Sequence, residues 1–285
     1  MAAEIAGFHD PATGTISYLL ADPASGTAAV IDSVLDFDPR SGRTAHASAD
    51  RVIAHVRAHG YTVSWVLETH VHADHLSGAP YVKRALGGRI GIGDRIPEVR
   101  RAFEAVFGFD RFADQTSPFD HLFADGERFA VGALEVRVMH TPGHTPACVT
   151  YLVEDAAFVG DTLFMPDGGT ARCDFPGGDA HALYRSIRRI LSLPDATRIF
   201  TAHDYAPGGR APAWESSVAA QRAGNIHLHD GVSEAEFVAM REQRDASLAM
   251  PTLLIPSIQV NLQAGELPGP DARGRRYLRI PVDML

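Results

Sequence analysis

Four side chains able to bind a metal ion lie within one short turn of this sequence. Residues 63–67 are apolar and predict a buried strand, and the turn that follows them contains three histidines and an aspartate. Imidazole nitrogens and carboxylate oxygens are donors that zinc, iron(II) and manganese accept, and a loop at a strand end lets neighbouring side chains converge. The turn therefore predicts a metal site that uses His70, His72, Asp74 and His75.

Three further clusters of metal-binding side chains also follow predicted strands. His144 follows the alternating segment 134–138, Asp161 follows a short apolar segment, and His203 follows another β-type segment. Four such clusters at strand ends are hard to attribute to chance. Together they offer seven potential ligands: His70, His72, Asp74, His75, His144, Asp161 and His203.

The residue types alone leave two kinds of metal site open. If all seven side chains bind, the site holds two ions bridged by Asp161, and a shared hydroxide becomes a hydrolytic nucleophile. If only His70, His144 and Asp161 bind, they leave roughly three positions open on a six-coordinate iron(II), enough for a substrate sulfur and dioxygen. Metal affinity does not choose between them, because zinc binds such donors at least as tightly as iron(II).

The elements that must position these ligands follow from residue periodicity and capping signals. Asp32 ends a predicted buried strand and is expected in a loop near the site, without an assigned role. Ser233 and Glu236 form a capping-box pattern, and the chain beyond Pro251 is expected to be irregular and to close one wall of the pocket. Strands are predicted over residues 15–20, 28–32, 63–67, 89–93, 127–131, 134–139, 148–153, 157–159 and 199–200, and helices over 48–60, 78–86, 97–107, 180–193, 214–223 and 233–246.

Composition limits the kinds of protein that fit this chain. Its 285 residues, 45% of them hydrophobic, can bury a full core, and a net charge of -9 argues against a nucleic-acid partner. The two cysteines, Cys148 and Cys173, form no CxxC pair, so we expect a reducing compartment. Neither a leader-like start nor a long uncharged span is visible, so we predict a cytoplasmic protein without a membrane partner.

The order of the four clusters, HxHxDH, PGHT, GDT and AHDY, resembles the metallo-β-lactamase superfamily. The resemblance runs from the N-terminal strands to at least Tyr205. It implies an α/β fold, an αββα sandwich of two mixed β-sheets flanked by helices, with the metal site at one edge between the sheets. Residues 1–210 would form the catalytic core, and residues 211–285 an extension packed on it. The fold alone implies no particular reaction.

The residues around the ligands are similar to those of one branch of this superfamily. Segments 142–148 and 160–175 resemble the persulfide dioxygenase (sulfur dioxygenase) branch, especially its bacterial β-lactamase-like hydrolase type, which shares the PSIQVN segment at 256–261. The resemblance implies one Fe(II) per chain on His70, His144 and Asp161, with the other four candidate ligands around it and zinc as the alternative metal. It also implies oxidation of glutathione persulfide, or a similar thiol persulfide, by O2 to sulfite and the free thiol.

Other residues of the predicted site have more than one interpretation. By the same resemblance, Arg172 would pair with a substrate carboxylate, and its alternative is an ion pair with Asp174. Tyr205 is a candidate to donate its hydroxyl to bound oxygen or substrate, with packing as an almost equal alternative. We expect Cys148 to be buried and Cys173 to be a small packing residue rather than a reactive thiol.

Two other functions compete with the dioxygenase hypothesis. The first is a dinuclear zinc thioester hydrolase of the glyoxalase II kind, or a lactonase; two metals per chain would favour it, although residues 172–175 and the tail differ from the glyoxalase pattern. The second is a sulfur-sensing or scaffold protein that keeps the ligands without activity. A small thiol persulfide and O2 are the expected partners, and a homodimer is left open.

Overall fold

The core strands of the fold are apolar on both faces, so they lie between other layers of the structure. The computed structural model describes residues 2–108 and 117–284. The chain enters one six-stranded sheet through an antiparallel β1-β2-β3 meander and continues with parallel strands. In spatial order this sheet contains β1 (Glu4–His9), β2 (Ile16–Asp22), β3 (Thr27–Ile31), β6 (Thr62–Leu67), β8 (Arg89–Gly93) and β9 (His121–Phe123).

A second six-stranded sheet packs against the first, and a small sheet lies at one edge. The second sheet is antiparallel except for the parallel pair β13 and β14. Its spatial order is β10 (Arg128–Val131), β11 (Leu134–His140), β12 (Val149–Val153), β13 (Ala156–Phe158), β14 (Arg198–Phe200) and β15 (Glu215–Ser217). The small sheet contains β5 (Arg43–Ala45), β4 (Val34–Asp38) and β7 (Leu76–Ser77).

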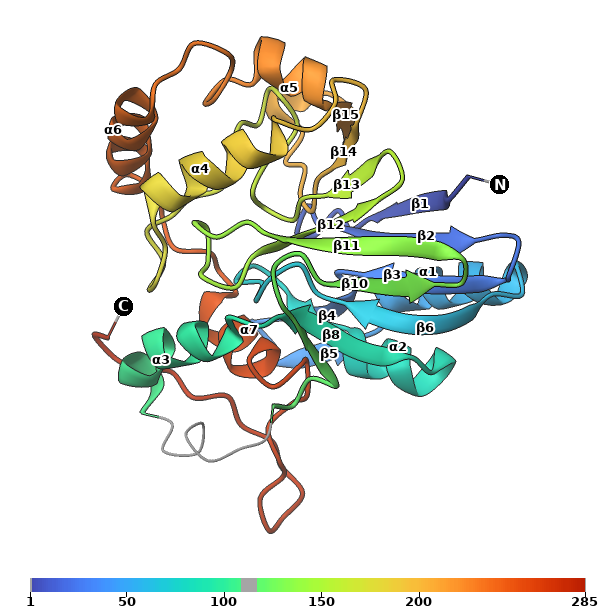
Figure 1. The fold of residues 1–285 in the computed structure, drawn as a ribbon. Helices are drawn as coiled ribbons and strands as arrows, with labels where there is room; N and C mark the ends of the chain where they lie inside the picture. The colour runs from blue at the N-terminus through green and yellow to red at the C-terminus, as the bar shows by residue number, and fades with distance from the viewer. Residues whose placement is uncertain (1, 109–116, 285) are drawn as a thin grey trace.

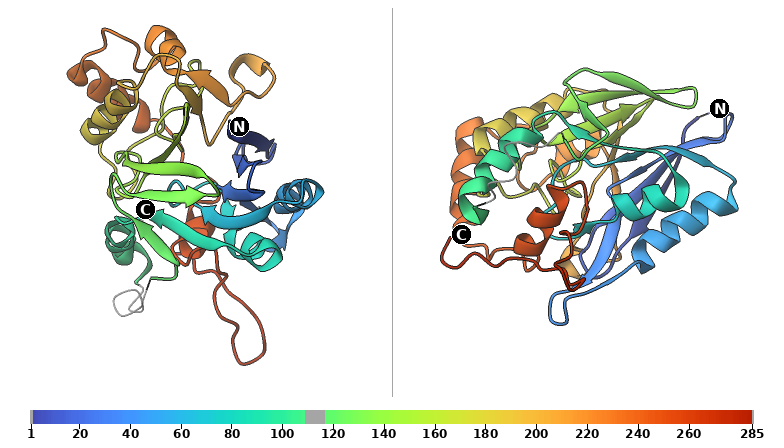
Figure 2. Two further views of the ribbon diagram at one scale, coloured as in Figure 1. Left: turned by 45° about the vertical axis from the view of Figure 1, so that its right-hand side comes forward. Right: turned by 90° about the horizontal axis from the view of Figure 1, so that it is seen from below.

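Helices cover the outer faces of the two large sheets (Figures 1 and 2). One set, with α1 and α2 against the first sheet, lies on the far side from the second set around α4 and α6. The helices are α1 (Ala47–Ala58), α2 (Ala79–Leu86), α3 (Ile96–Phe107), α4 (Ala180–Ile190), α5 (Val218–Gly224), α6 (Glu234–Asp245) and α7 (Leu254–Asn261), with a 3-10 turn η1 (Pro207–Gly209).

The three largest buried clusters lie at the three interfaces of these four layers. Leu19 and Val30 point from the first sheet toward helices α1 to α3, whereas their neighbour Tyr18 points into the cluster between the sheets. On the outer face of the second sheet, Ile199 packs with α4 and α6 residues such as Phe237. Alternate residues of one strand thus fill different interfaces. The αββα sandwich predicted from the sequence is confirmed.

Two of the predicted elements are wrong in detail. Residues 214–223 were expected to form one helix, but Glu215–Ser217 pairs with β14 as an edge strand and Ser217 then caps α5. The tail beyond Pro251 was expected to be irregular, but it contains α7, whose residues Leu254 and Ile258 join the first core cluster. The capping box of Ser233 and Glu236 is present as predicted at the start of α6.

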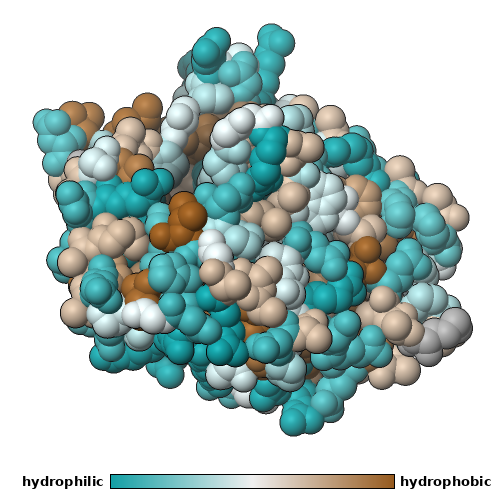
Figure 3. All heavy atoms as spheres, turned by 90° about the horizontal axis from the view of Figure 1, so that it is seen from above, coloured by the Kyte–Doolittle hydropathy of each residue, from teal (hydrophilic) through white to brown (hydrophobic). Residues whose placement is uncertain are grey.

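The helices and the face of the molecule drawn in Figure 3 show how the apolar residues are distributed outside the core. No helix within residues 2–108 and 117–284 is long and apolar enough to cross a membrane. On the face drawn in Figure 3, the hydrophobic residues form small separate groups among hydrophilic ones. Such scattered groups are normal for the surface of a folded protein.

Candidate metal centre

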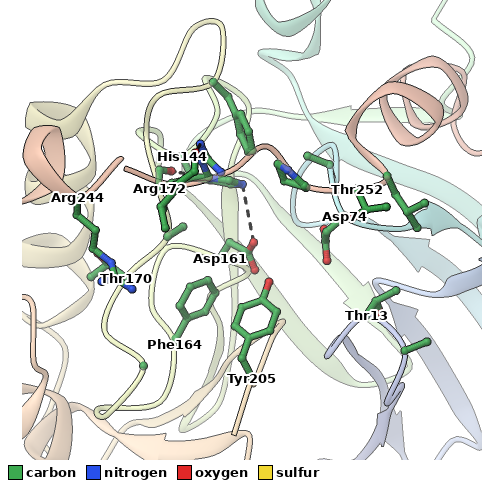
Figure 4. A pocket seen from close by; sticks show the side chains of 18 of the residues that line it. Thr13, Asp74, His144, Asp161, Phe164, Thr170, Arg172, Tyr205, Arg244 and Thr252 are labelled. Atoms are coloured by element: carbon green, nitrogen blue, oxygen red, sulfur yellow. Dashed lines mark hydrogen bonds and ion pairs between the residues drawn. The ribbon is translucent and has the colours of Figure 1, made fainter. Parts of the chain in front are cut away.

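The loops that follow four strands bring all seven predicted ligands together at one edge of the sandwich. The HxHxDH turn follows β6, and the remaining three ligands follow β11, β13 and β14. One group of donor atoms comes from His70, His144 and Asp161, and a second comes from His72, Asp74, His75 and His203; within each group every donor lies within 4.8 Å of the others. Figure 4 shows three of these side chains, His144, Asp161 and Asp74, facing one cavity.

The first group has the geometry of three ligands around one ion. The Nε2 atoms of His70 and His144 lie 3.7 and 3.8 Å from Oδ2 of Asp161, too far for hydrogen bonds. An ion bound to all three at normal bond lengths of about 2.0–2.2 Å separates its ligand atoms by distances of this order. All three side chains are buried. The arrangement can therefore hold a cation on two imidazoles and one carboxylate.

His203 connects this group to the second one. Its Nδ1 lies 2.5 Å from Oδ1 of Asp161, and its Nε2 lies 2.5 Å from Oδ2 of Asp74. Burial alone would lower the pKa of His203, but the two carboxylate charges raise it well above its ordinary value. Burial raises the pKa of Asp74, but the charge and hydrogen bond of His203, together with the charges of His75 and His72, lower it below its ordinary value. The raised pKa favours a protonated His203 when no ion is bound, and a metal ion at this site would displace that proton.

In three of the histidines, a hydrogen bond at one ring nitrogen determines that the other nitrogen faces the metal site. Nδ1 of His75 and of His144 must donate, because their partners are the carbonyl oxygens of Leu76 and Arg172, at 3.0 and 2.8 Å. Nδ1 of His70 also donates, because its partner, the Thr69 hydroxyl, gives its own proton to Asp32. Each Nε2 is thus left with a free lone pair, as a metal ligand requires.

His72 is held in the opposite tautomer. Its Nε2 lies 3.0 Å from Asp32 and 3.4 Å from Glu68, so it donates and leaves Nδ1 as the free nitrogen. Burial lowers the pKa of His72, but the charge of Asp32 and the bonds to both carboxylates raise it to about 10. Without an ion, Nδ1 therefore carries a proton at neutral pH, and a metal bound at Nδ1 would displace that proton. For His75, burial and the charge of His72 lower the pKa to about 4, so this ring is neutral at pH 7.

Several buried donor atoms of the site lack a hydrogen-bond partner in the described part of the chain, which is the observation that fits a metal. Nε2 of His70, Nδ1 of His72 and Nε2 of His75 make no hydrogen bond among the described residues, and Oδ2 of Asp74 has only its ion pair with His203. Leaving such atoms unpaired costs about 1–3 kcal/mol each, and a cation would satisfy them together. The residues fit one ion or two, and this donor set accepts both iron and zinc.

Sequence reasoning missed three residues that support the ligands. Asp32 is buried and accepts from the Thr69 amide and hydroxyl, both at 2.8 Å, and from His72. Its φ of 52° is a left-handed conformation that aspartate tolerates. Asn261 of α7 donates to the carbonyls of His72 and His75, and Glu68 completes the contacts of His72. Asp32 gave a signal by its place at the end of a buried strand, and Asn261 lies in the PSIQVN segment, whereas Glu68 gave none.

The ligands open onto a cavity of about 860 Å³ whose walls come from distant parts of the chain. Phe164 and Phe175 line it beside the metal centre, and Leu248 and Leu253 contribute from the segment between α6 and α7. Tyr205 is 62% exposed and its ring stacks on that of His203, with centroids 5.8 Å apart. A tyrosine hydroxyl has a pKa of about 10, so that of Tyr205 is protonated at neutral pH and able to donate.

Three arginines line the cavity, and two of them are committed to neighbours. Arg172 forms the predicted alternative, an ion pair with Asp174 through Nε and Nη2, both at 2.6 Å, and its Nη1 donates to the Ala249 carbonyl. The buried Arg241 pairs with Asp245 on the same helix. Arg244 is exposed, and its guanidinium has no hydrogen-bond or ion-pair partner among the described residues.

The two cysteines are packing residues, and neither is a reactive thiol. Cys148 is 2% exposed and receives hydrogen bonds from Thr145; Cys173 is 7% exposed within the cluster under α4. Burial raises the pKa of each thiol to about 12. Thiolates are therefore rare at neutral pH, in agreement with the prediction from the sequence.

Comparison with known proteins defines the class first. A family model described as the metallo-beta-lactamase superfamily matches residues 11–203, and the chain belongs to that family. Among curated relatives, a probable metallo-hydrolase of Burkholderia pseudomallei is 58% identical, with 99% of each chain covered. A protein of Dictyostelium discoideum named glyoxylase B2 is 44% identical, over 99% of this chain and 98% of the relative.

Similarity also extends to the predicted branch. The human mitochondrial persulfide dioxygenase ETHE1 is 32% identical over 69% of this chain and 66% of its own. Among solved structures, ETHE1 from Myxococcus xanthus has a TM-score of 0.74 at 28% identity, with 93% of this chain and 100% of that chain covered. The similarity to the persulfide dioxygenase branch that the sequence motifs indicated is therefore confirmed.

Proposed function

We propose that this protein is a persulfide dioxygenase with one iron(II) ion on His70, His144 and Asp161. The reaction consumes one persulfide, one O2 and one water, and yields sulfite, the free thiol and two protons. The observation that carries the proposal is the three-ligand group itself, which uses two imidazoles and a carboxylate and faces a wide cavity. The likeness to ETHE1 proteins supports the same assignment.

Iron(II), when bound, supplies the redox chemistry, and the protein supplies its position and surroundings. The Arg172 carbonyl and the Thr69 hydroxyl fix the rings of His144 and His70, so the ligand set is oriented before substrate arrives. Phe164 and Phe175 give the cavity beside the ligands an apolar wall that limits water. Tyr205 points toward Asp161 in Figure 4, so we propose that its hydroxyl donates to the substrate or to oxygen.

The carrier of the persulfide is proposed to be a small thiol that has a carboxylate, such as glutathione. The sequence assigned the carboxylate to Arg172, whose two nitrogens already hold Asp174. We propose instead that Arg244 binds the carboxylate, because it lines the same cavity and has no partner among the described residues. A guanidinium binds a carboxylate through two parallel hydrogen bonds.

A dinuclear zinc thioester hydrolase or lactonase is the second candidate. The group of His72, Asp74, His75 and His203 favours it, because these donors can hold a second ion beside the first. The names of the Burkholderia and Dictyostelium relatives favour it as well. Hydrolysis would then use the same cavity with water as the nucleophile.

Metal content measured together with two assays separates the candidates. Protein purified without added metal and then loaded anaerobically with iron(II) is expected to bind one iron per chain and to consume one O2 per glutathione persulfide. Uptake no greater than that of metal-free protein would exclude the dioxygenase. Two zinc ions bound by the seven candidate ligands themselves, with rapid cleavage of S-lactoylglutathione, would establish the hydrolase.

A further inference from the structure

A separate cluster of metal-binding side chains lies where strand β1 meets helix α1. It consists of Glu4, the first residue of β1, with His55 of α1 and His59, the residue that caps the end of this helix. The metal centre lies beyond the other end of β1, where Thr15 bonds His203. The length of β1, roughly 17–20 Å of extended chain, separates the two places.

The three side chains converge without satisfying one another. One donor atom of each lies within 4.8 Å of the other two. Nε2 of His55 is 3.9 Å from Oε1 of Glu4, which is too long for a hydrogen bond, and it is buried without a hydrogen-bond partner among the described residues. The rings of His55 and His59 stack with centroids 4.1 Å apart, as histidines four residues apart on a helix can.

Neighbouring groups already orient two of the donors. The Tyr61 hydroxyl donates to Oε2 of Glu4 at 2.7 Å, so Oε1 is the free oxygen that faces His55. Nδ1 of His59 donates to the His55 carbonyl at 2.8 Å, which leaves Nε2 of His59 with its lone pair. Supporting hydrogen bonds of this kind select the tautomer and the ring direction of histidine ligands in metal sites.

We infer that Glu4, His55 and His59 form a second binding site for a divalent transition metal of the zinc class. Two imidazole nitrogens and one carboxylate oxygen match the donor preference of Zn²⁺, and the exposed side of His59 leaves a fourth position to water. Bound metal would join the N-terminal strand to α1 and stabilise that edge of the first sheet. The role is structural, and it does not depend on the reaction at the metal centre.

The test compares zinc binding by the full-length protein and by His59→Ala. Both are dialysed against the same saturating free Zn²⁺, and bound zinc is measured per chain. Wild type is expected to bind one zinc more than the variant, and its melting temperature is expected to rise with zinc by an amount that His59→Ala lacks. Glu4→Gln, which keeps the size of the side chain, is expected to weaken the same zinc equivalent at least tenfold.

A matched control separates this site from general surface binding of zinc. His181 pairs with Glu234 at 2.9 Å, so it is a histidine beside a carboxylate without a second histidine donor in the group. His181→Ala is expected to bind as much zinc as wild type. Two results would overturn the inference: equal bound zinc in wild type and His59→Ala, or a loss of bound zinc in His181→Ala as large as that in His59→Ala. Activity at the metal centre is assayed separately.

Discussion

Each histidine of the metal centre depends on the residue that bonds its other nitrogen. Asp32 alone fixes two of them, because it accepts from His72 directly and from His70 through the Thr69 hydroxyl. The sequence proposed seven candidate ligands by type and spacing, and the fold brings them together, yet it gave Asp32 no role, because a carboxylate that supports a ligand has no spacing pattern of its own. Supporting groups of this kind govern metal affinity almost as strongly as the ligands do.

Replacing Asp32 with asparagine is expected to lower metal affinity about tenfold to a hundredfold. Asparagine tolerates the left-handed backbone at this position, but its amide cannot accept from both the Thr69 hydroxyl and His72. Competition with a chelator measures the affinity. Asp36→Asn is the control, since Asp36 accepts from the Ser48 amide at 3.2 Å and contacts no ligand. Equal affinities in all three proteins would contradict the role given to Asp32.

Replacing Arg244 with alanine is expected to raise KM for glutathione persulfide roughly tenfold to a hundredfold, while kcat changes little. The reason is that a hydrogen bond between charged groups contributes about 1.5–3 kcal/mol to binding. For a persulfide carrier without carboxylates, wild type and variant are expected to have equal KM. Arg185→Ala, on the surface of α4 beside Glu234, is the control. Oxygen uptake measures all of these, and an unchanged KM for glutathione persulfide would assign the carboxylate to another residue.

Secondary structure was predictable where local signals acted alone. The capping box of Ser233 predicted the start of α6, and Gly60 predicted the end of α1. Helix α7 was missed because Pro256 suggested a break, whereas proline is tolerated in the first turn of a helix, where this one lies. Strand β15 was missed because its pairing with β14 is a tertiary contact, which outweighs the helical pattern of residues 214–223.

Helix α7 is expected to hold the HxHxDH turn through Asn261. Its amide donates to the His72 and His75 carbonyls and accepts from the Ser77 amide, each at 2.8 Å, in a buried site. Asn261→Ala leaves these groups unpaired, so the free energy of unfolding is expected to fall by about 3 kcal/mol, together with metal content. Urea unfolding and metal analysis measure the two effects.

The control for Asn261 lies on the same helix. Gln259 bonds the backbone of Arg279 in the tail and contacts no part of the metal-binding turn. Gln259→Ala is therefore expected to lose some stability but to keep its full metal content. If both variants keep their metal, α7 stabilises the fold without supporting the site.

His227, in the segment between α5 and α6, is expected to make the stability of the fold depend on pH. Burial and the charge of Arg241 lower the pKa of His227 to about 4, and its Nδ1 accepts from the Thr170 amide at 2.9 Å. The unfolded ring titrates near pH 6.5, so the unfolded state binds more protons between about pH 4 and 6.5. Stability from this group is therefore present above pH 6.5 and is lost as the pH falls toward 4.

In denaturant titrations, His227→Gln is expected to remove about 1–2 kcal/mol of this pH dependence, a value reduced for the partial exposure of the ring. Comparing the variant with wild type cancels the contributions to the pH dependence from other groups that titrate in the same range, such as His75. His229→Gln, at an exposed ring nearby, is expected to follow the wild-type curve. A His227→Gln curve parallel to that of wild type would show that this ring does not titrate as proposed.

At the scale of the whole molecule, the sandwich brings residues that are distant in the sequence together in one site. Strands β6, β11, β13 and β14 end at the same edge, which is why ligands more than a hundred residues apart converge. The order of the motifs was sufficient to predict this edge through the family resemblance. The cavity walls could not be predicted, because Arg244 and Leu253 reach the site through packing of the C-terminal segment, which has no repeated pattern.

Removal of the metal is expected to leave the fold in place but lower its melting temperature. The buried core clusters do not include the ligands, so the sheets persist, while Nε2 of His70 and Nε2 of His75, which make no hydrogen bond among the described residues, lose the ion that would satisfy them. An ion at about a hundred times its dissociation constant contributes about 2.7 kcal/mol, or roughly 5–10 °C for a chain of this size. Calorimetry of chelated and reloaded His59→Ala protein measures this centre alone, with far-UV circular dichroism to follow the fold. Identical melting temperatures with and without metal would mean that the buried donors are satisfied in some other way.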